Sequence, residues 1–330
     1  AIDEGITMEP EQILSIGLQA LKKEQERFNA AARIINKNKT PIQVHEDIQK
    51  EHPSADSLIP TAKQHLEAIR QFLLDKNICT MPSSEVRVLV KETPQFARAT
   101  STASMDVVGP FEKKATESYY YITSVDATWN AKQKEDWLRQ FDYYTTDNIT
   151  VHEAYPGHYT QFLHLNASSA TKLEKIFGNY AYVEGWAHYC EQMMIEQGFG
   201  NNGDLVTAAK YRLAQSDDAL LRLCRLCNSI SIHCGGATID GGTKFFMNNW
   251  YQGEKPSYQE ALRGSFDPGY LFYTLGKLEI LKLRNDYQKQ QGDKYSLKDF
   301  NDKMMDNGMP PVRLLRERLL KDKSSWDAIL

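Results

Sequence analysis

The sequence lacks the features that mark membrane, nucleic-acid-binding and repeat proteins. No apolar run approaches the roughly 18 residues that a membrane span needs, so we expect none in this chain. The 39 basic and 43 acidic residues give a net charge of −4, which excludes the strongly basic character that nucleic-acid binding favours. No internal repeat or low-complexity tract is visible. The composition, 41% apolar and 25% charged, is typical of a soluble globular protein.

Cysteine is also scarce. The five cysteines are too few and too unevenly spaced for a disulfide framework; they are Cys79, Cys190, Cys224, Cys227 and Cys234. Cys224 and Cys227 have the spacing of a metal or redox pair, but they lie in a helical pattern and no second pair completes a structural zinc site. Small buried thiols are the favoured interpretation. In an exported protein these thiols would have to be shielded from oxidation.

Two parts of the chain differ in their sequence patterns. Residues 1–80 predict an amino-terminal helical segment, with amphipathic helices at 9–36 and 53–74. Residues 81–330 predict one larger domain in which helical patterns dominate. No leader is visible, so the compartment stays open: cytoplasmic, exported, or lipid-anchored in a longer chain.

A small antiparallel sheet is expected among the helices. Residues 85–92 alternate as a strand does, and residues 98–104 and 119–122 would supply its partners. A strand edge would hold an extended peptide, or the tyrosines would pack the sheet face. Helical patterns fill residues 131–147, 157–166, 179–197, 204–233, 242–251, 270–288, 296–306 and 311–321. The predicted fold class is mainly α with a small antiparallel β-sheet (α+β).

The chemistry concentrates at residues 152–158, which read His-Glu-Ala-Tyr-Pro-Gly-His. A His-Glu pair followed by a second histidine is typical of zinc hydrolases, in which the second histidine usually stands four positions after the first. Here that position is Pro156, and on an ideal helix His158 would lie about 120° away from His152. Proline breaks the helical hydrogen bonds and glycine tolerates unusual backbone angles. A kink there would return both histidines to one face, in a helix that Thr150 would cap.

The segment at residues 184–191, Glu-Gly-Trp-Ala-His-Tyr-Cys-Glu, offers a third ligand. A catalytic zinc ion takes three protein ligands and keeps one position open. Glu184 comes far enough downstream to lie on a returning helix, and His188 shares its face. Solvated helix polar groups are the alternative for Glu184, His188 and Glu191. The neighbouring Trp186 indicates burial instead, and a buried carboxylate needs a partner.

Together these segments resemble the bacterial family called domain of unknown function 885 (DUF885). The resemblance continues through residues 267–277, Asp-Pro-Gly-Tyr-Leu-Phe-Tyr-Thr-Leu-Gly-Lys, and the tail at 310–320. It implies a zincin-like metallopeptidase whose third ligand is a glutamate. It also implies that this chain, which begins at Ala1, is the carboxy-terminal part of a longer protein.

The motif and the resemblance assign roles to eight residues. One zinc ion would be held by His152, His158 and Glu184. Glu153 would act as the general base that takes a proton from the metal-activated water. The oxyanion of the transition state would receive a hydrogen bond from one of three candidate donors, which are His188, His233 and Tyr273. Arg225 would bind a substrate carboxylate.

These supporting roles have structural alternatives. The family commonly reads Asp-Thr-Gly-aliphatic-His where residues 229–233 read Ser-Ile-Ser-Ile-His, so the histidine is kept and the aspartate is replaced. Without the resemblance, His233 would be a satisfied core histidine. Tyr273 is one of 17 tyrosines, most of which pack as amphipathic aromatics. We expect His188 to stop short of the metal, because a fourth ligand would leave Glu153 no water to activate.

The leading hypothesis is a zinc-dependent hydrolase of peptide bonds. One alternative is a non-catalytic protein in which the metal joins two helices or a former active site binds peptides. A closed structural site would need a fourth ligand such as His188, and Glu153 would then have no task. The other alternative is a metallohydrolase of non-peptide amides or esters, which nothing in the sequence separates from the first. The substrate and the oligomeric state stay open.

Overall fold

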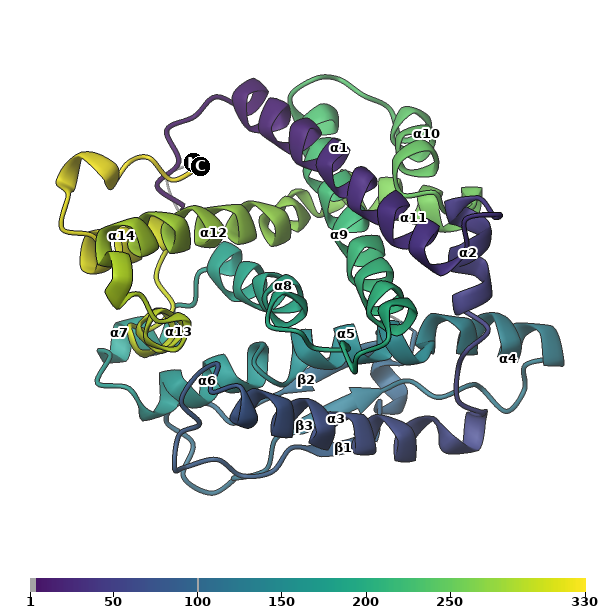
Figure 1. Ribbon diagram of the computed structural model, residues 1–330, viewed down its shortest axis with the longest axis horizontal. Helices are drawn as coiled ribbons and strands as arrows, with labels where there is room; N and C mark the ends of the chain where they lie inside the picture. The colour runs from purple at the N-terminus through teal and green to yellow at the C-terminus, as the bar shows by residue number, and fades with distance from the viewer. Residues whose placement is uncertain (1–3, 100) are drawn as a thin grey trace.

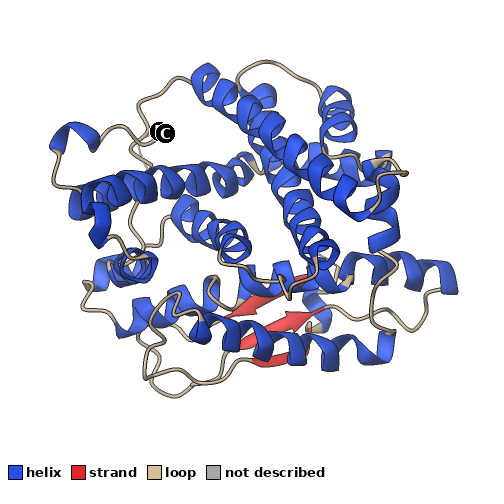
Figure 2. Cartoon of the chain, in the orientation of Figure 1, coloured by secondary structure: helices blue, strands red, loops and turns tan. Residues whose placement is uncertain are grey.

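The computed structural model describes residues 4–99 and 101–330 as a mainly helical molecule with one small sheet (Figure 1) (Figure 2). The α-helices are α1 (Pro10–Ile35), α2 (Pro41–Ile48), α3 (Leu58–Asp75), α4 (Ala131–Leu138), α5 (Tyr143–Glu153), α6 (His158–Ala167), α7 (Lys172–Ile176), α8 (Tyr180–Glu196), α9 (Leu205–His233), α10 (Ile239–Asn249), α11 (Glu254–Phe266), α12 (Phe272–Gln291), α13 (Leu297–Asp306) and α14 (Val312–Leu319). Within the described ranges, no helix combines the length and hydrophobicity that a membrane crossing needs.

The mainly helical class predicted from the sequence is confirmed. Three helices were not predicted: α2, α7 and α11. The first two have 8 and 5 residues, which is too short for a periodic pattern to stand out. Helix α11 carries Pro256 in its first turn and Gly264 near its end, and both residues weaken a helical pattern.

The sheet is mixed, so the predicted antiparallel arrangement is confirmed for one of its two strand pairings and wrong for the other. Its strands are β1 (Leu89–Glu92), β2 (Ala103–Asp106) and β3 (Tyr119–Ile122), in the spatial order β1-β3-β2. Strand β3 pairs in parallel with β1 and antiparallel with β2. Alternation within each strand carries no information about the direction of its neighbour, which the connections decide. Tyr120 is buried and packs the sheet face, as one of the two expected roles of the tyrosines requires.

The sheet lies against the helices that begin the candidate site. Helix α3 packs against β1, and α5 packs against both α3 and β2. The Tyr120 hydroxyl lies 3.2 Å from the Thr150 hydroxyl of α5. On the opposite side, α5 contacts α8 and α9. Helix α5 therefore lies between the sheet and the two long helices, which keeps its carboxyl end inside the molecule.

Helices α8 and α12 run side by side with their backbones in close approach (Figure 1). Gly185 of α8 faces Gly276 of α12: a Cβ added to Gly185 would lie 2.6 Å from the Gly276 Cα. A Cβ added to Gly276 would lie 2.6 Å from the Ala181 carbonyl carbon. Neither position has room for a larger residue, because backbone atoms cannot rotate away as a side chain does. The contact fixes the place of α12 beside Glu184.

We predict that Gly276→Ala separates the two helices and lowers the free energy of unfolding by about 1–3 kcal/mol or more, the usual cost of overpacking. Urea unfolding followed by circular dichroism measures this change. The matched control is Gly109→Ala, because a Cβ at Gly109 would meet no atom within 4 Å. Equal stability of the two variants would contradict the close approach.

Candidate metal centre

The chain between His152 and His158 forms a break between two helices rather than a kink in one. Helix α5 ends at Glu153 and α6 begins at His158. The Gly157 amide donates to the Val151 carbonyl at 3.0 Å. A Cβ at Gly157 would lie 2.5 Å from the His152 carbonyl carbon, so only glycine fits this turn. The break does what the expected kink would do and brings the second histidine back towards the first.

The predicted amino-terminal cap of the helix that carries His152 is wrong. Asp142 caps α5, and its carboxylate accepts hydrogen bonds from the amides of Tyr144 and Thr145. Thr150 lies inside the last two turns of α5, where its hydroxyl donates to the Thr146 carbonyl at 2.8 Å. His152 is consequently at the carboxyl end of its helix and not at the beginning.

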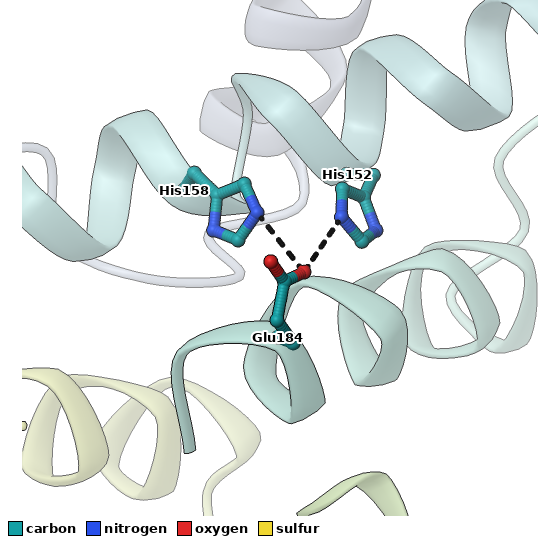
Figure 3. Close-up of side chains that lie close together, drawn as sticks. All are labelled: His152, His158 and Glu184. Atoms are coloured by element: carbon teal, nitrogen blue, oxygen red, sulfur yellow. Dashed lines mark ion pairs between the residues drawn. The ribbon is translucent and has the colours of Figure 1, made fainter. Parts of the chain in front are cut away.

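Three predicted ligands meet at one point (Figure 3). The Nε2 atoms of His152 and His158 lie 3.4 and 3.5 Å from the same oxygen, Oε2 of Glu184. One ligand atom from each residue lies within 4.8 Å of the others. The two imidazole rings are nearly perpendicular, with centroids 4.8 Å apart. The helices α5, α6 and α8 each contribute one of the three side chains.

The polar atoms at this point are only partly satisfied by the protein. Glu184 Oε2 and His158 Nδ1 are buried and lack a hydrogen-bond partner among the described residues. Buried polar atoms are rarely left in this condition. Two imidazoles and one carboxylate form the ligand set of a catalytic zinc ion. The donor atoms present therefore fit a divalent cation of this kind.

Glu191 binds the far nitrogen of His152, Nδ1. The sequence did not predict a role for Glu191 in the site. Its Oε1 accepts from His152 Nδ1 at 2.7 Å, and its Oε2 accepts from His188 Nδ1 at 2.9 Å. The Arg222 guanidinium lies 3.4 Å from Oε1. A carboxylate on the far nitrogen of a ligating histidine sets its tautomer and its orientation. The available signal was spacing, since Glu191 lies seven residues, or two turns, after Glu184.

Charge around the group shifts the pKa values of its members. Burial lowers the pKa of His152, but the carboxylates of Glu184 and Glu191 outweigh burial and raise this pKa to about 10. Burial raises the pKa of Glu184, but the positive charge of His158 and His152 outweighs it and holds this pKa below its usual range. His152 thus lies between the carboxylates of Glu184 and Glu191, which stabilise its protonated form.

Glu153, the predicted base, follows His152 and ends α5. Burial raises the pKa of its carboxyl group, while the nearby His152 and His158 oppose this shift. It does not belong to the group of three ligand atoms. A carboxyl group with a raised pKa beside a cation site is suited to proton transfer.

Two of the predicted oxyanion donors lie next to the group. His188 is buried, and its Nε2 faces Lys277 Nζ at 3.5 Å while its Nδ1 binds Glu191. It stands outside the group of three ligand atoms. The Tyr273 ring stacks near His152 with centroids 6.3 Å apart, and the guanidinium of Arg222 lies 5.7 Å from its centre. Tyr273 is therefore the candidate donor whose ring borders a ligand.

The two remaining candidates bind helix α11 instead. Arg225 donates two hydrogen bonds to the Glu260 carboxylate, at 2.7 and 2.8 Å. This pair already fills the bidentate arrangement that a substrate carboxylate would need. His233 Nε2 lies 2.8 Å from the Gly264 carbonyl oxygen, which gives the ring a partner in the manner of a satisfied structural histidine.

Comparisons place the chain among bacterial proteins. The family model described as "Bacterial protein of unknown function (DUF885)" matches residues 2–319. No curated protein matches the chain. A structure from Shewanella oneidensis, described as "a putative lipoprotein of unknown function", has a TM-score of 0.86 and 25% identity, covering 97% of this chain and 58% of that chain. A "putative lipoprotein from Colwellia psychrerythraea" has a TM-score of 0.81 and 23% identity, covering 94% and 52%. The chain thus spans little more than half the length of both.

We predict that Zn²⁺ binding to the metal-free protein releases about one proton per ion between about pH 7 and 9. With its pKa raised to about 10, His152 is protonated in this range, and a metal must displace the proton from Nε2. Calorimetric titration in buffers of different ionisation enthalpy measures the number released. Glu191→Gln, which removes one carboxylate from His152, should reduce it. Binding without proton release would contradict the assignment of His152.

Proposed function

The chain belongs to the bacterial DUF885 family, and we propose that it is a zinc-dependent hydrolase of peptide bonds with a zincin-like catalytic domain. The observation that carries the proposal is the convergence of His152, His158 and Glu184 on one point, where both imidazole Nε2 atoms face the same buried Glu184 oxygen without forming a hydrogen bond to it. A purely structural pair would place an imidazole nitrogen at about 2.7–3.2 Å from that oxygen, whereas both nitrogens lie farther away. The adjacent Glu153 supports a catalytic role, because a closed structural site has no use for a base.

The residues of the site would have separate roles in peptide hydrolysis. Zinc, when bound by His152, His158 and Glu184, would supply a Lewis acid and lower the pKa of a water molecule at the open position. Glu153 would accept a proton from this water as its oxygen attacks the carbonyl carbon. Glu153 would then pass the proton to the amide nitrogen as the C–N bond breaks and the amine leaves.

Tyr273 is the best-placed donor for the oxyanion. Its hydroxyl is hydrogen-bonded to that of Tyr180, and burial raises the pKa of Tyr273. The hydroxyl therefore stays protonated and able to donate. Arg222 and Arg225 lie over its ring at 5.7 and 5.6 Å. These cations add positive potential on the side where negative charge develops. His188 is instead assigned a positioning role, through its hydrogen bond to Glu191.

The sheet favours an extended peptide as the substrate. Strand β2 pairs with β3 on one side only, within the described residues, and it packs against α5. An edge strand beside the helix that carries His152 and Glu153 offers backbone groups for pairing with a peptide. An ester or a small amide would have no use for such an edge.

We also propose an exported, lipid-anchored location for the full-length protein. The support is the description of the Shewanella oneidensis structure as "a putative lipoprotein". Four of the five cysteines are buried, as an oxidising compartment would require. They are Cys79, Cys190, Cys224 and Cys227, whereas Cys234 is exposed.

We predict that Glu153→Gln keeps its fold and its zinc while losing about 10²–10⁴-fold in peptide hydrolysis, because an amide cannot accept the proton. Glu184→Gln should lose zinc instead. Metal analysis and a mixed-peptide digestion read by mass spectrometry measure both properties. Glu135→Gln, which removes an exposed carboxylate that pairs with Arg139, is the control and should change neither. Loss of zinc from Glu153→Gln with retention in Glu184→Gln would mean that the two roles are exchanged.

We predict that His188→Ala weakens zinc binding about 10–100-fold, because a ligand's supporting carboxylate loses its own partner. The hydrogen bond from His188 Nδ1 holds Glu191, whose other oxygen holds His152. Zinc affinity and turnover at saturating zinc separate this role from that of an oxyanion donor. Unchanged affinity with a 10²–10³-fold loss of kcat would instead assign His188 to the oxyanion.

A further inference from the structure

A cavity of about 250 Å³ lies beyond His188 and is lined by residues of helices α1, α8, α9 and α12. It is far larger than the roughly 10–15 Å³ that a single water molecule requires. His152, His158 and Glu184 do not line it. The cavity is therefore separate from the candidate metal centre, and the ring of His188 stands between the two.

The inner wall of the cavity carries the buried ammonium group of Lys277, which forms no ion pair with the described residues. Lys277 is 6% exposed, and its ammonium group faces the His188 Nε2 atom at 3.5 Å. Among the described residues, no carboxylate lies within ion-pair distance of it. A buried ammonium group normally pairs with an anion, because leaving water without one costs several kcal/mol.

A second polar group beside Lys277 also lacks a partner. Thr274 lies on α12 three residues before Lys277, so both side chains share one helix face. Its side chain is 2% exposed, and its hydroxyl has no hydrogen-bond partner among the described residues. Both groups line the cavity. Together they offer one positive charge and one hydroxyl donor to a molecule inside.

The outer part of the cavity adds more positive charge. Lys23 and Arg27 of α1 line it and are exposed. Of the described residues that line the cavity, Glu24 alone carries a carboxylate. Its oxygens are occupied, since Arg27 donates to one at 2.9 Å and the Ser216 hydroxyl donates to the other at 2.6 Å. The charge of Glu24 acts on Lys277 through space, but both of its oxygens already accept hydrogen bonds from other partners.

We propose that this cavity binds a small anion whose carboxylate or phosphate group lies between Lys277 and Thr274. Such a group would supply the counter-charge of the ammonium and accept the hydroxyl hydrogen bond, which satisfies both unpartnered groups at once. A cation would be repelled by the three basic side chains, and an apolar ligand would leave the buried polar groups unsatisfied. The site goes beyond the proposed hydrolysis and does not depend on a bound metal.

The test is calorimetric titration of the protein, as purified and again after chelator treatment, with sodium phosphate and with sodium succinate at constant ionic strength. We expect saturable binding of at least one of the two, and Lys277→Met should weaken it at least tenfold. The control is Lys282→Met on the same helix, whose ammonium pairs with Asp286. It should bind as the unaltered protein does. Phosphate alone would identify a phosphate group as the preferred ligand, and succinate alone would identify a carboxylate.

Two further measurements guard the interpretation. Because Lys277→Met removes an unpaired buried charge and keeps its volume, its Tm without added anion should equal or exceed that of the unaltered protein. Should that variant fail to fold, Thr274→Val is the second test and should weaken binding about tenfold. Undiminished affinity in the folded variants, or no saturable binding of either anion to the unaltered protein, would overturn the proposal. Turnover is not the readout, so this result is independent of the proposed hydrolysis.

Discussion

The shared carboxylate of Glu191 is the interaction on which the centre of the molecule depends. Its two oxygens bind Nδ1 of His152 and Nδ1 of His188, and Arg222 approaches the same group from α9. One buried carboxylate thereby joins α5, α8 and α9. A lone carboxylate in this position would be costly, but three donors stabilise its charge and keep its pKa well below the usual range although burial opposes this. Its charge in turn points His152 Nε2 towards Glu184.

Two close backbone contacts make that arrangement possible. Gly157 lets the chain turn sharply between α5 and α6, where a Cβ would collide with the His152 carbonyl. Gly185 and Gly276 let α12 approach α8 until Tyr273 borders His152 and Lys277 borders His188. Each of these close contacts depends on only one or two glycine residues. Their effect is to bring charged side chains from five helices into one small, water-poor region, where electrostatic interactions are strong.

The local sequence pattern was sufficient to predict the long helices and the grouping of His152, His158 and Glu184, because periodicity and spacing are encoded within a few turns. It was insufficient wherever a partner comes from elsewhere in the chain. A six-residue spacing fits either a kink or a break, and the break was decided by packing around Gly157. The pairing of Arg225 with a glutamate 35 residues later leaves no trace in either segment. The prediction of strand direction was wrong for the same reason, because the connections before and after β2 determine how β1 and β3 pair.

The environment of Glu153 links the proposed base to the proposed metal. Burial and the negative charge of Glu184 raise the pKa of Glu153, while the histidines lower it. A carboxyl group that burial alone controlled would hold its proton and could not act as a base. A dication at His152, His158 and Glu184 would add positive charge beside it, which favours the ionised form. The dication would thus oppose the effect of burial on the pKa of Glu153 and favour the carboxylate that accepts the proton. In this arrangement metal binding and ionisation of the glutamate favour each other, which couples the proposed base to the proposed ligands.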